Sequence, residues 1–273
     1  MFKNILIPTD GSAHSLTASR YAIELARIYG ATIHGLSVVN IKLTQGQFIA
    51  DLSNIVRLDR SQLEEVLQDK GRAFLAQLSE ACQKAGVTCK MSSSMGIIGD
   101  SICEKARIAD LIAMGKYGES SEWTGPLLGS VAETVVRQAD KPVLLASKEY
   151  QPIKRILIAY DSGRSANYML HFAANLAMHL RVPITVLVVS DVEKRGKAVL
   201  EEAQIYLEAY KVEVEPLLKD GEPAEEILFT AEDRDVNLIA MGAYGHHIRE
   251  FILGSLTEHV MREANCPVLL YRY

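Results

Sequence analysis

The chain has 273 residues, of which 48% are hydrophobic and 23% are charged, and its formal net charge is -5. This is the composition of an ordinary globular protein, and the acidic balance argues against a nucleic-acid binder, which would need a basic face. No apolar run reaches the about 18 residues that a membrane helix needs, and the N-terminus leads directly into a strand pattern rather than a signal peptide. We therefore expect a cytoplasmic protein that does not enter a membrane.

The cysteines are scattered and include no Cys-x-x-Cys pair. In a chain without an export signal, such cysteines are most often small buried hydrophobic residues, with metal binding or redox switching as the alternative. They are Cys82, Cys89, Cys103 and Cys266.

The first half begins with an apolar strand pattern at Ile5–Pro8. A longer segment between Asn40 and Gly71 carries a predicted helix from Arg60 onward. This segment is either a flap over a first site or only a longer loop and helix.

The same sequence signals return in the second half, in the same order. Leu111–Gly118 recurs as Leu238–Gly245 with seven of eight positions identical. Further matches pair Leu128–Glu133 with Leu253–Glu258, Pro142–Leu145 with Pro267–Leu270, and Ile5–Asp10 with Ile156–Asp161. The repeat is therefore a whole domain, and the polar link ending at Pro152 separates a first domain, 1–147, from a second, 153–273.

Strand and helix patterns alternate through the second half. The predicted strands are Arg155–Ala159, Ile184–Val189, Val212–Leu217, Val236–Met241 and Val268–Tyr271. The predicted helices are Ser162–Leu180, Lys194–Tyr210, Ala224–Ala231 and Leu253–Glu263. Continuous apolar strands separated by helices predict the α/β class: two tandem doubly wound domains, each a five-stranded parallel sheet with helices on both faces.

Short polar sequences follow these strands, at the edge where open parallel sheets bind ligands. In the second half, Asp161 follows the first strand and Gly242–Gly245 the fourth, and Gly254-Ser255 opens the next helix. A helix N-terminus approached through glycine is a ready anion site. The alternative is ordinary turns and caps, but the full set occurs in both halves.

These residues resemble the universal stress protein family, over essentially the whole chain and twice. Its ATP-binding members carry glycine, two residues, glycine, nine residues, glycine, then serine or threonine. Here the first half has ten residues before Gly129-Ser130 and the second has eight before Gly254-Ser255, so the two spacings depart from the family value in opposite directions.

The resemblance implies a Rossmann-like fold, similar to that of the adenine nucleotide alpha hydrolases, and a regulatory role in the stress response through adenine-nucleotide binding. The ligand implied is ATP, or else ADP or AMP, and magnesium is the ion that could bind together with it. The implied site residues are Asp10, Val38, Gly115, Gly118, Gly129 and Ser130 in the first half, and Asp161, Val189, Gly242, Gly245, Gly254 and Ser255 in the second. Asp10 and Asp161 match the aspartate that contacts the adenosine part, Val38 and Val189 the position whose backbone reads adenine, and the rest the phosphate loop. For each aspartate, an Asx turn is the rival interpretation.

The loops that carry these motifs differ in charge. The first holds Glu119 and Glu122, which oppose a triphosphate and which Lys116 offsets only in part. The second holds His246, His247 and Arg249 against one acid, Glu250. We therefore predict that the second half is the better nucleotide site, although its histidines are equally well explained as exposed loop residues.

Several enzyme motifs are missing from the sequence, among them the P-loop, the Gly-x-Ser-x-Gly elbow and the kinase loops. Two alternatives to a nucleotide-binding regulator stay open: an interaction module of the same fold that binds unknown protein partners and no nucleotide, and a slow ATPase.

The resemblance also implies an internal pseudo-dimer in which the two domains pair through their last strands. Val143–Leu145 and Val268–Leu270 are apolar, and unpaired apolar edges invite strand pairing. The sequence leaves open whether whole chains dimerise further.

Overall fold

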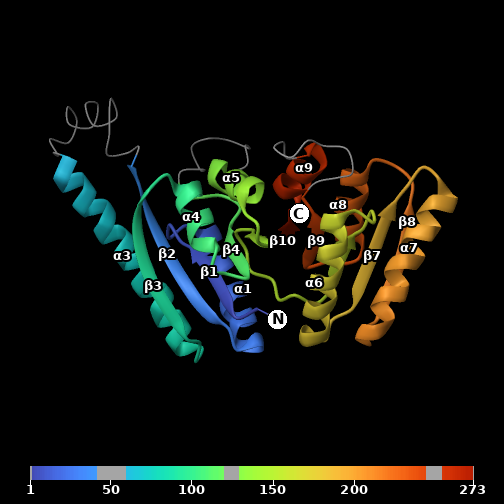
Figure 1. Cartoon of the computed structure of the whole chain (residues 1–273), viewed down its shortest axis with the longest axis horizontal. Helices are drawn as coiled ribbons and strands as arrows, with labels where there is room; N and C mark the ends of the chain where they lie inside the picture. Colours follow the sequence, from blue (N-terminus) through green and yellow to red (C-terminus); the bar gives the residue numbers. More distant parts are fainter. Residues whose placement is uncertain (1, 42–59, 120–128, 244–253, 273) are drawn as a thin grey trace.

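The computed structural model describes residues 2–41, 60–119, 129–243 and 254–272, which form one continuous twisted sheet with helices on both faces (Figure 1). The strands of the first half are β1 (Asn4–Pro8), β2 (Thr32–Asn40), β3 (Cys89–Gly96), β4 (Leu111–Gly115) and β5 (Val143–Ala146). Those of the second half are β6 (Ile156–Ala159), β7 (Ile184–Val189), β8 (Val214–Lys219), β9 (Leu238–Gly242) and β10 (Val268–Tyr271).

The sheet has the order β3-β2-β1-β4-β5-β10-β9-β6-β7-β8. Pairing is parallel within each half and antiparallel between β5 and β10. Strand order reverses between β1 and β4 in the first half and between β6 and β9 in the second. The predicted fold class is confirmed, and these two reversal points are where the fold opens crevices for ligands.

Helices connect the strands in the alternating order predicted. Those of the first half are α1 (Ala13–Tyr29), α3 (Arg60–Lys84), α4 (Ile98–Ala106) and α5 (Ser130–Gln138). Those of the second half are α6 (Arg164–Leu180), α7 (Glu193–Leu207), α8 (Pro223–Asp233) and α9 (Ser255–Glu263). Local chemistry sets their ends: the Ser12 hydroxyl caps α1 by accepting from the Ser15 N–H, and Gly30, at φ 63°, ends it.

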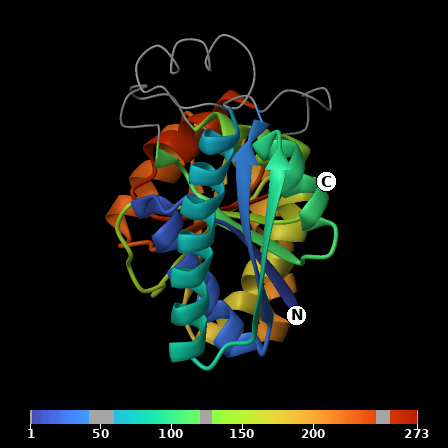
Figure 2. The ribbon, with the colours of Figure 1, turned by 90° about the vertical axis from the view of Figure 1, so that its left-hand side faces the viewer.

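Alternation along the strands divides the apolar side chains between two faces. Ile5 and Ile7 of β1 belong to the cluster on the face covered by α1, α3, α6 and α7, whereas Leu6 belongs to the cluster on the face covered by α4, α5, α8 and α9. Both clusters extend through the two halves. Figure 2 shows α3 lying along the sheet beside β2 and edge strand β3.

Several boundaries differ from the prediction by one to three residues: β6 begins at Ile156 and not Arg155, β9 covers Leu238–Gly242 and not Val236–Met241, and the region before β8 differs most clearly. The pattern predicts a helix to Tyr210 and a strand from Val212, but α7 ends at Leu207 and a 3-10 turn covers Glu208–Tyr210. Lys211 then takes a left-handed conformation, φ 52°, which reverses the chain, so β8 begins at Val214.

The junction between the halves is an antiparallel ladder of buried leucines and valines. Val268 lies opposite Leu145, Leu269 opposite Leu144, and Leu270 opposite Val143. This is the strand pair that the apolar sequences at the ends of both halves predict.

Helix α1 ties the two halves together beside that ladder. Its Tyr29 hydroxyl donates to Asn175 Oδ1 of α6 at 3.2 Å, and its ring lies 4.6 Å from that of His179. The segment joining the halves is also bound to α1: Tyr21 donates to the Gln151 carbonyl at 2.7 Å and accepts from its N–H at 3.0 Å.

The strand ladder makes a direct prediction about Leu269. Leu269→Pro removes a backbone donor from β10 and crowds the neighbouring strand, so we expect the halves to melt in two separate calorimetric transitions and the scattering envelope to lengthen. Leu269→Ala keeps the donor and truncates the same buried side chain; it should lower the free energy of unfolding by about 2–5 kcal/mol and keep one compact particle. A single unchanged transition for the proline variant would show that the ladder does not hold the halves together.

Candidate functional site

A cavity of about 600 Å³ opens at the carboxyl ends of β1, β2 and β4, where strand order reverses. All six residues predicted for the first half line it: Asp10, Val38, Gly115, Gly118, Gly129 and Ser130. Residues that are about 100 positions apart in the sequence meet here because the ends of parallel strands share one edge of the sheet.

Asp10 connects two loops at the cavity. Its Oδ1 accepts from the Ser12 N–H at 3.0 Å, which is the Asx turn weighed above, and its Oδ2 accepts from the Glu119 N–H at 3.0 Å. The Asx turn therefore fixes the Asp10 carboxylate, and the hydrogen bond from Glu119 joins the end of β1 to the segment after β4.

Each glycine of the first motif permits a close approach. A Cβ on Gly115 would lie 2.6 Å from His14 Cβ, so this glycine lets β4 end against the first turn of α1. A Cβ on Gly118 would lie 2.8 Å from Asp10 Oδ2, and one on Gly129 would lie 2.8 Å from the Lys116 carbonyl oxygen. Gly115 thus serves packing, whereas Gly118 and Gly129 let the backbone lie close to Asp10 and to the Lys116 carbonyl at the cavity.

Helix α5 points its N-terminus at the cavity. Gly129 is its N-cap and supplies no side-chain cap, and the first intrahelical bond runs from the Glu133 N–H to the Gly129 carbonyl. The preceding N–H groups, with Ser130 and Val131 in the cavity wall, are donors suited to an anion.

The opposite part of the wall is apolar. Leu36 and Val38 of β2, Ile98 and Ile102 of α4, and Met114 of β4 line it. A cavity of this size, apolar at one end and rich in donors at the other, has the character of a small-molecule site.

Helix α3 adds a wall that the motifs did not predict. Leu67, Lys70, Gly71 and Phe74 line the cavity, and Phe74 packs so closely on Gly11, at φ 75°, that a Cβ there would lie 2.1 Å from its ring. The inserted segment therefore contributes to the site through this helix; residues 42–59, the rest of the flap hypothesis, lie outside the described chain.

Lys116 does not face the cavity acids, in contrast to the interpretation made from the sequence. It is 2% exposed, and its ammonium donates to the Ala264 carbonyl at the end of α9, in the other half. Burial lowers the pKa of Lys116 to about 8, although Cys266 and Glu263 act in the opposite direction. The Lys116 side chain therefore lies in the junction between the two halves. At the matching position of the second half, the repeat has Ala243.

The second half repeats the main geometry among its described residues. Asp161 accepts from the Gly163 N–H at 2.8 Å in its own Asx turn, and a Cβ on Gly242 would lie 2.9 Å from Ser165 Cβ. Gly254 is the N-cap of α9, with Ser255 as its first residue and no side-chain cap, and Val189 ends β7. Gly245, His246, His247 and Arg249 lie outside the described residues.

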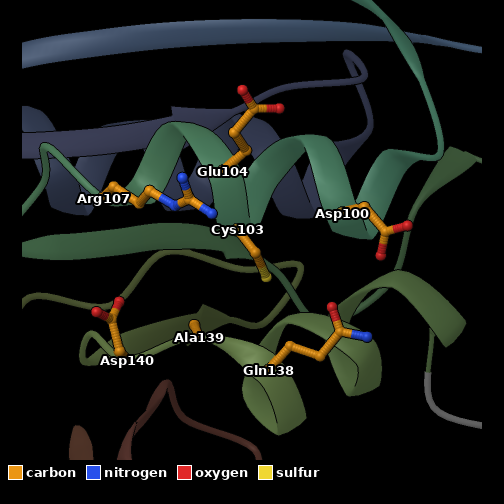
Figure 3. A pocket seen from close by; sticks show the side chains of 7 residues that line it. All are labelled: Asp100, Cys103, Glu104, Arg107, Gln138, Ala139 and Asp140. Atoms are coloured by element: carbon orange, nitrogen blue, oxygen red, sulfur yellow. The ribbon is translucent and has the colours of Figure 1, made fainter.

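A second hollow lies between α4 and the end of α5, with a volume of about 500 Å³ (Figure 3). The Cys103 side chain points into it, flanked by Asp100, Asp140 and Arg107. Burial raises the pKa of the Cys103 thiol to about 11, so it stays a protonated thiol and not a thiolate nucleophile.

A profile of the universal stress protein family matches residues 1–147 and 152–272. The chain belongs to the universal stress protein family. Universal stress protein Slr1230 of Synechocystis sp. is 31% identical over 290 aligned residues, which cover 99% of this chain and 100% of that protein. Universal stress protein MJ0531 of Methanocaldococcus jannaschii is 32% identical over 150 residues, 54% of this chain and 84% of its own.

The tandem architecture is shared with a solved structure. The crystal structure of a universal stress protein from Archaeoglobus fulgidus superposes with a TM-score of 0.78 at 24% identity, over 98% of both chains. Within the described ranges, no helix of this universal stress protein has the length and apolar character to cross a membrane, and no cluster of three metal-binding side chains occurs.

The burial of Lys116 predicts a pH-dependent stability. The folded state lowers the pKa of Lys116 from 10.5 to about 8, so between these values the unfolded chain binds more protons. The free energy of unfolding of the wild type should therefore rise with pH across this window relative to Lys116→Met, by at most about 3 kcal/mol. Denaturant titrations at pH 7 and pH 10 measure this, with exposed Lys105→Met as the control; a difference that is constant with pH would contradict it.

Proposed function

We propose that this universal stress protein is a regulatory binder of adenine nucleotides, with ATP as the ligand and ADP or AMP as members of the same class. The observation that carries the proposal is the first-half cavity, in which six residues matched to the family's nucleotide site line one space at the point where strand order reverses. Its volume suits one nucleotide.

The polarity of the cavity favours one orientation of the ligand. The flat base fits the apolar end near Val38 and Ile102, where β2 continues past its last pairing with β1 and its backbone can read the edge of the base. In this orientation Asp10 would contact the sugar hydroxyls, and the phosphates would lie by Gly118 and the N–H donors at the start of α5.

Magnesium suits the same end of the cavity. Asp10 supplies carboxylate oxygens there, which are the ligands that Mg²⁺ prefers. When bound, the ion would offset negative charge on the phosphates, which the carboxylates of Asp10 and Glu119 otherwise oppose.

Gly118 provides the test of this placement. In Gly118→Asp a second carboxylate would lie beside Asp10, so we expect ATP affinity at the first site to fall roughly tenfold or more, measured by isothermal titration calorimetry. Gly118→Asn, of the same size but neutral, should weaken binding less and so separates charge from bulk. Unchanged affinity in the aspartate variant would refute a phosphate position at this loop.

Gly245 tests the ranking of the two halves. The more basic second loop predicts that Gly245→Asp removes most of the ATP binding of the whole chain, whereas Gly118→Asp removes a smaller share. Calorimetry on both variants decides it: loss of most binding in Gly118→Asp with little change in Gly245→Asp would reverse the ranking and make the first half the main site.

A further inference from the structure

An ion pair closes one side of the first-half cavity. The Lys70 ammonium on α3 lies 2.6 Å from Glu119 Oε1 and donates to its Oε2 at 2.7 Å, and both residues line the cavity. Their side chains are 45% and 59% exposed, so the pair stands at the mouth of the cavity, in contact with solvent.

Lys70 is the cation that an anionic ligand would meet. The charged residues in the cavity lining are Asp10, Lys70, Lys116 and Glu119. Of the two lysines, Lys116 turns its ammonium away to the Ala264 carbonyl and is buried. Lys70 therefore carries the positive charge available to phosphate at this cavity, within the part of the chain that the structure describes.

Glu119 is held beside Lys70 by its own backbone. Its N–H donates to Asp10 Oδ2 at 3.0 Å, so the residue is fixed at the cavity mouth by the same carboxylate that orders the end of β1. On the other side, Lys70 lies one helical turn before Phe74, whose ring packs on Gly11. Two fixed backbones thus hold the opposite charges beside one another at the mouth of the cavity.

The internal repeat places a cation at the same point of both halves. Gly71 of α3 and Gly196 of α7 both pack closely on their neighbours and occupy equivalent positions of the repeat. The residues directly before them, Lys70 and Arg195, therefore correspond to one another. By the same repeat, with Tyr117-Gly118 matching Tyr244-Gly245, Glu119 corresponds to His246. A basic residue before the helix glycine is thus common to the two halves, whereas the position of Glu119 is occupied by a histidine in the second half.

We propose that Lys70 is a phosphate-binding residue of the first site and that Glu119 competes with the ligand for it. This inference rests on the proposed nucleotide function and assigns the regulation of the same site. An exposed pair of flexible side chains is weak, and phosphate offers the ammonium an acceptor at least as strong as a carboxylate. The ligand exchanges places with Glu119, whose carboxylate is displaced from Lys70 into solvent, and the first site is held at reduced affinity by this competition.

The test is a gain of affinity. Because Glu119→Gln frees Lys70 and removes a charge that repels phosphate, ATP should bind the first site roughly threefold to tenfold more tightly. Lys70→Gln should weaken binding by a similar factor, and the gain from Glu119→Gln should shrink when both changes are combined. Trp123, the chain's only tryptophan, lies in the sequence between Gly118 and Gly129, so its emission during ATP titration reports on this half.

The matched control lies on the same helix. Glu80 and Lys84 of α3 form an exposed pair at 2.6 Å that does not line the cavity, so Glu80→Gln should leave ATP affinity unchanged. Unfolding curves of all variants establish that each is folded.

Separate outcomes identify which idea fails. If the wild type binds ATP and Glu119→Gln binds no more tightly, or Lys70→Gln no more weakly, the competition is wrong and the proposed function stands. If ATP binds neither the wild type nor any of these variants, the proposed function itself is wrong and the inference falls with it.

Discussion

The antiparallel pairing of β5 with β10 is the interaction on which the rest of the structure depends. Each half alone would end its sheet on a short apolar strand with an unpaired backbone edge, which is an invitation to aggregation. Pairing the two edges converts two five-stranded sheets into one of ten and buries Leu144 and Leu269 almost completely. It also lets the apolar cluster on each face continue from one half into the other.

That pairing also brings the end of β4 close to the opposite half. Because β4 and β9 flank the central pair, the residue after β4, Lys116, reaches the end of α9. On the same face, the Arg272 guanidinium donates to the Arg137 carbonyl at the end of α5. The contact by Lys116 has no equivalent at Ala243, whose side chain is a methyl group. The two halves are repeats in backbone but differ in the charges that they place at the sites.

Much of this could be predicted from the sequence. Strands at Ile184–Val189 and Val268–Tyr271 agree residue for residue with their apolar runs, because continuous burial on both faces gives a strong signal. The six first-half site residues meet because strand ends in a parallel sheet share one edge.

Other features depend on packing that no local pattern records. Lys116 stands between two loop glycines, and only the tertiary structure shows that its side chain turns into the junction. Lys70 and Phe74 reach the cavity from the inserted helix, which shows no binding motif. The signal that was available for Lys70 is its basic counterpart Arg195 in the repeat. The short strand after Lys211 was misplaced because a left-handed turn by a lysine leaves no mark in composition.

The central claim is that a nucleotide occupies the carboxyl edge of this sheet, and native mass spectrometry of the intact chain tests it most directly. The protein is measured as purified and again during titration with ATP, under conditions that keep it folded. We expect an added mass of one adenine nucleotide for each occupied half, released when the protein is denatured. A spectrum that shows only the bare chain at every ATP concentration up to the millimolar range would contradict the account and favour an interaction module of the same fold.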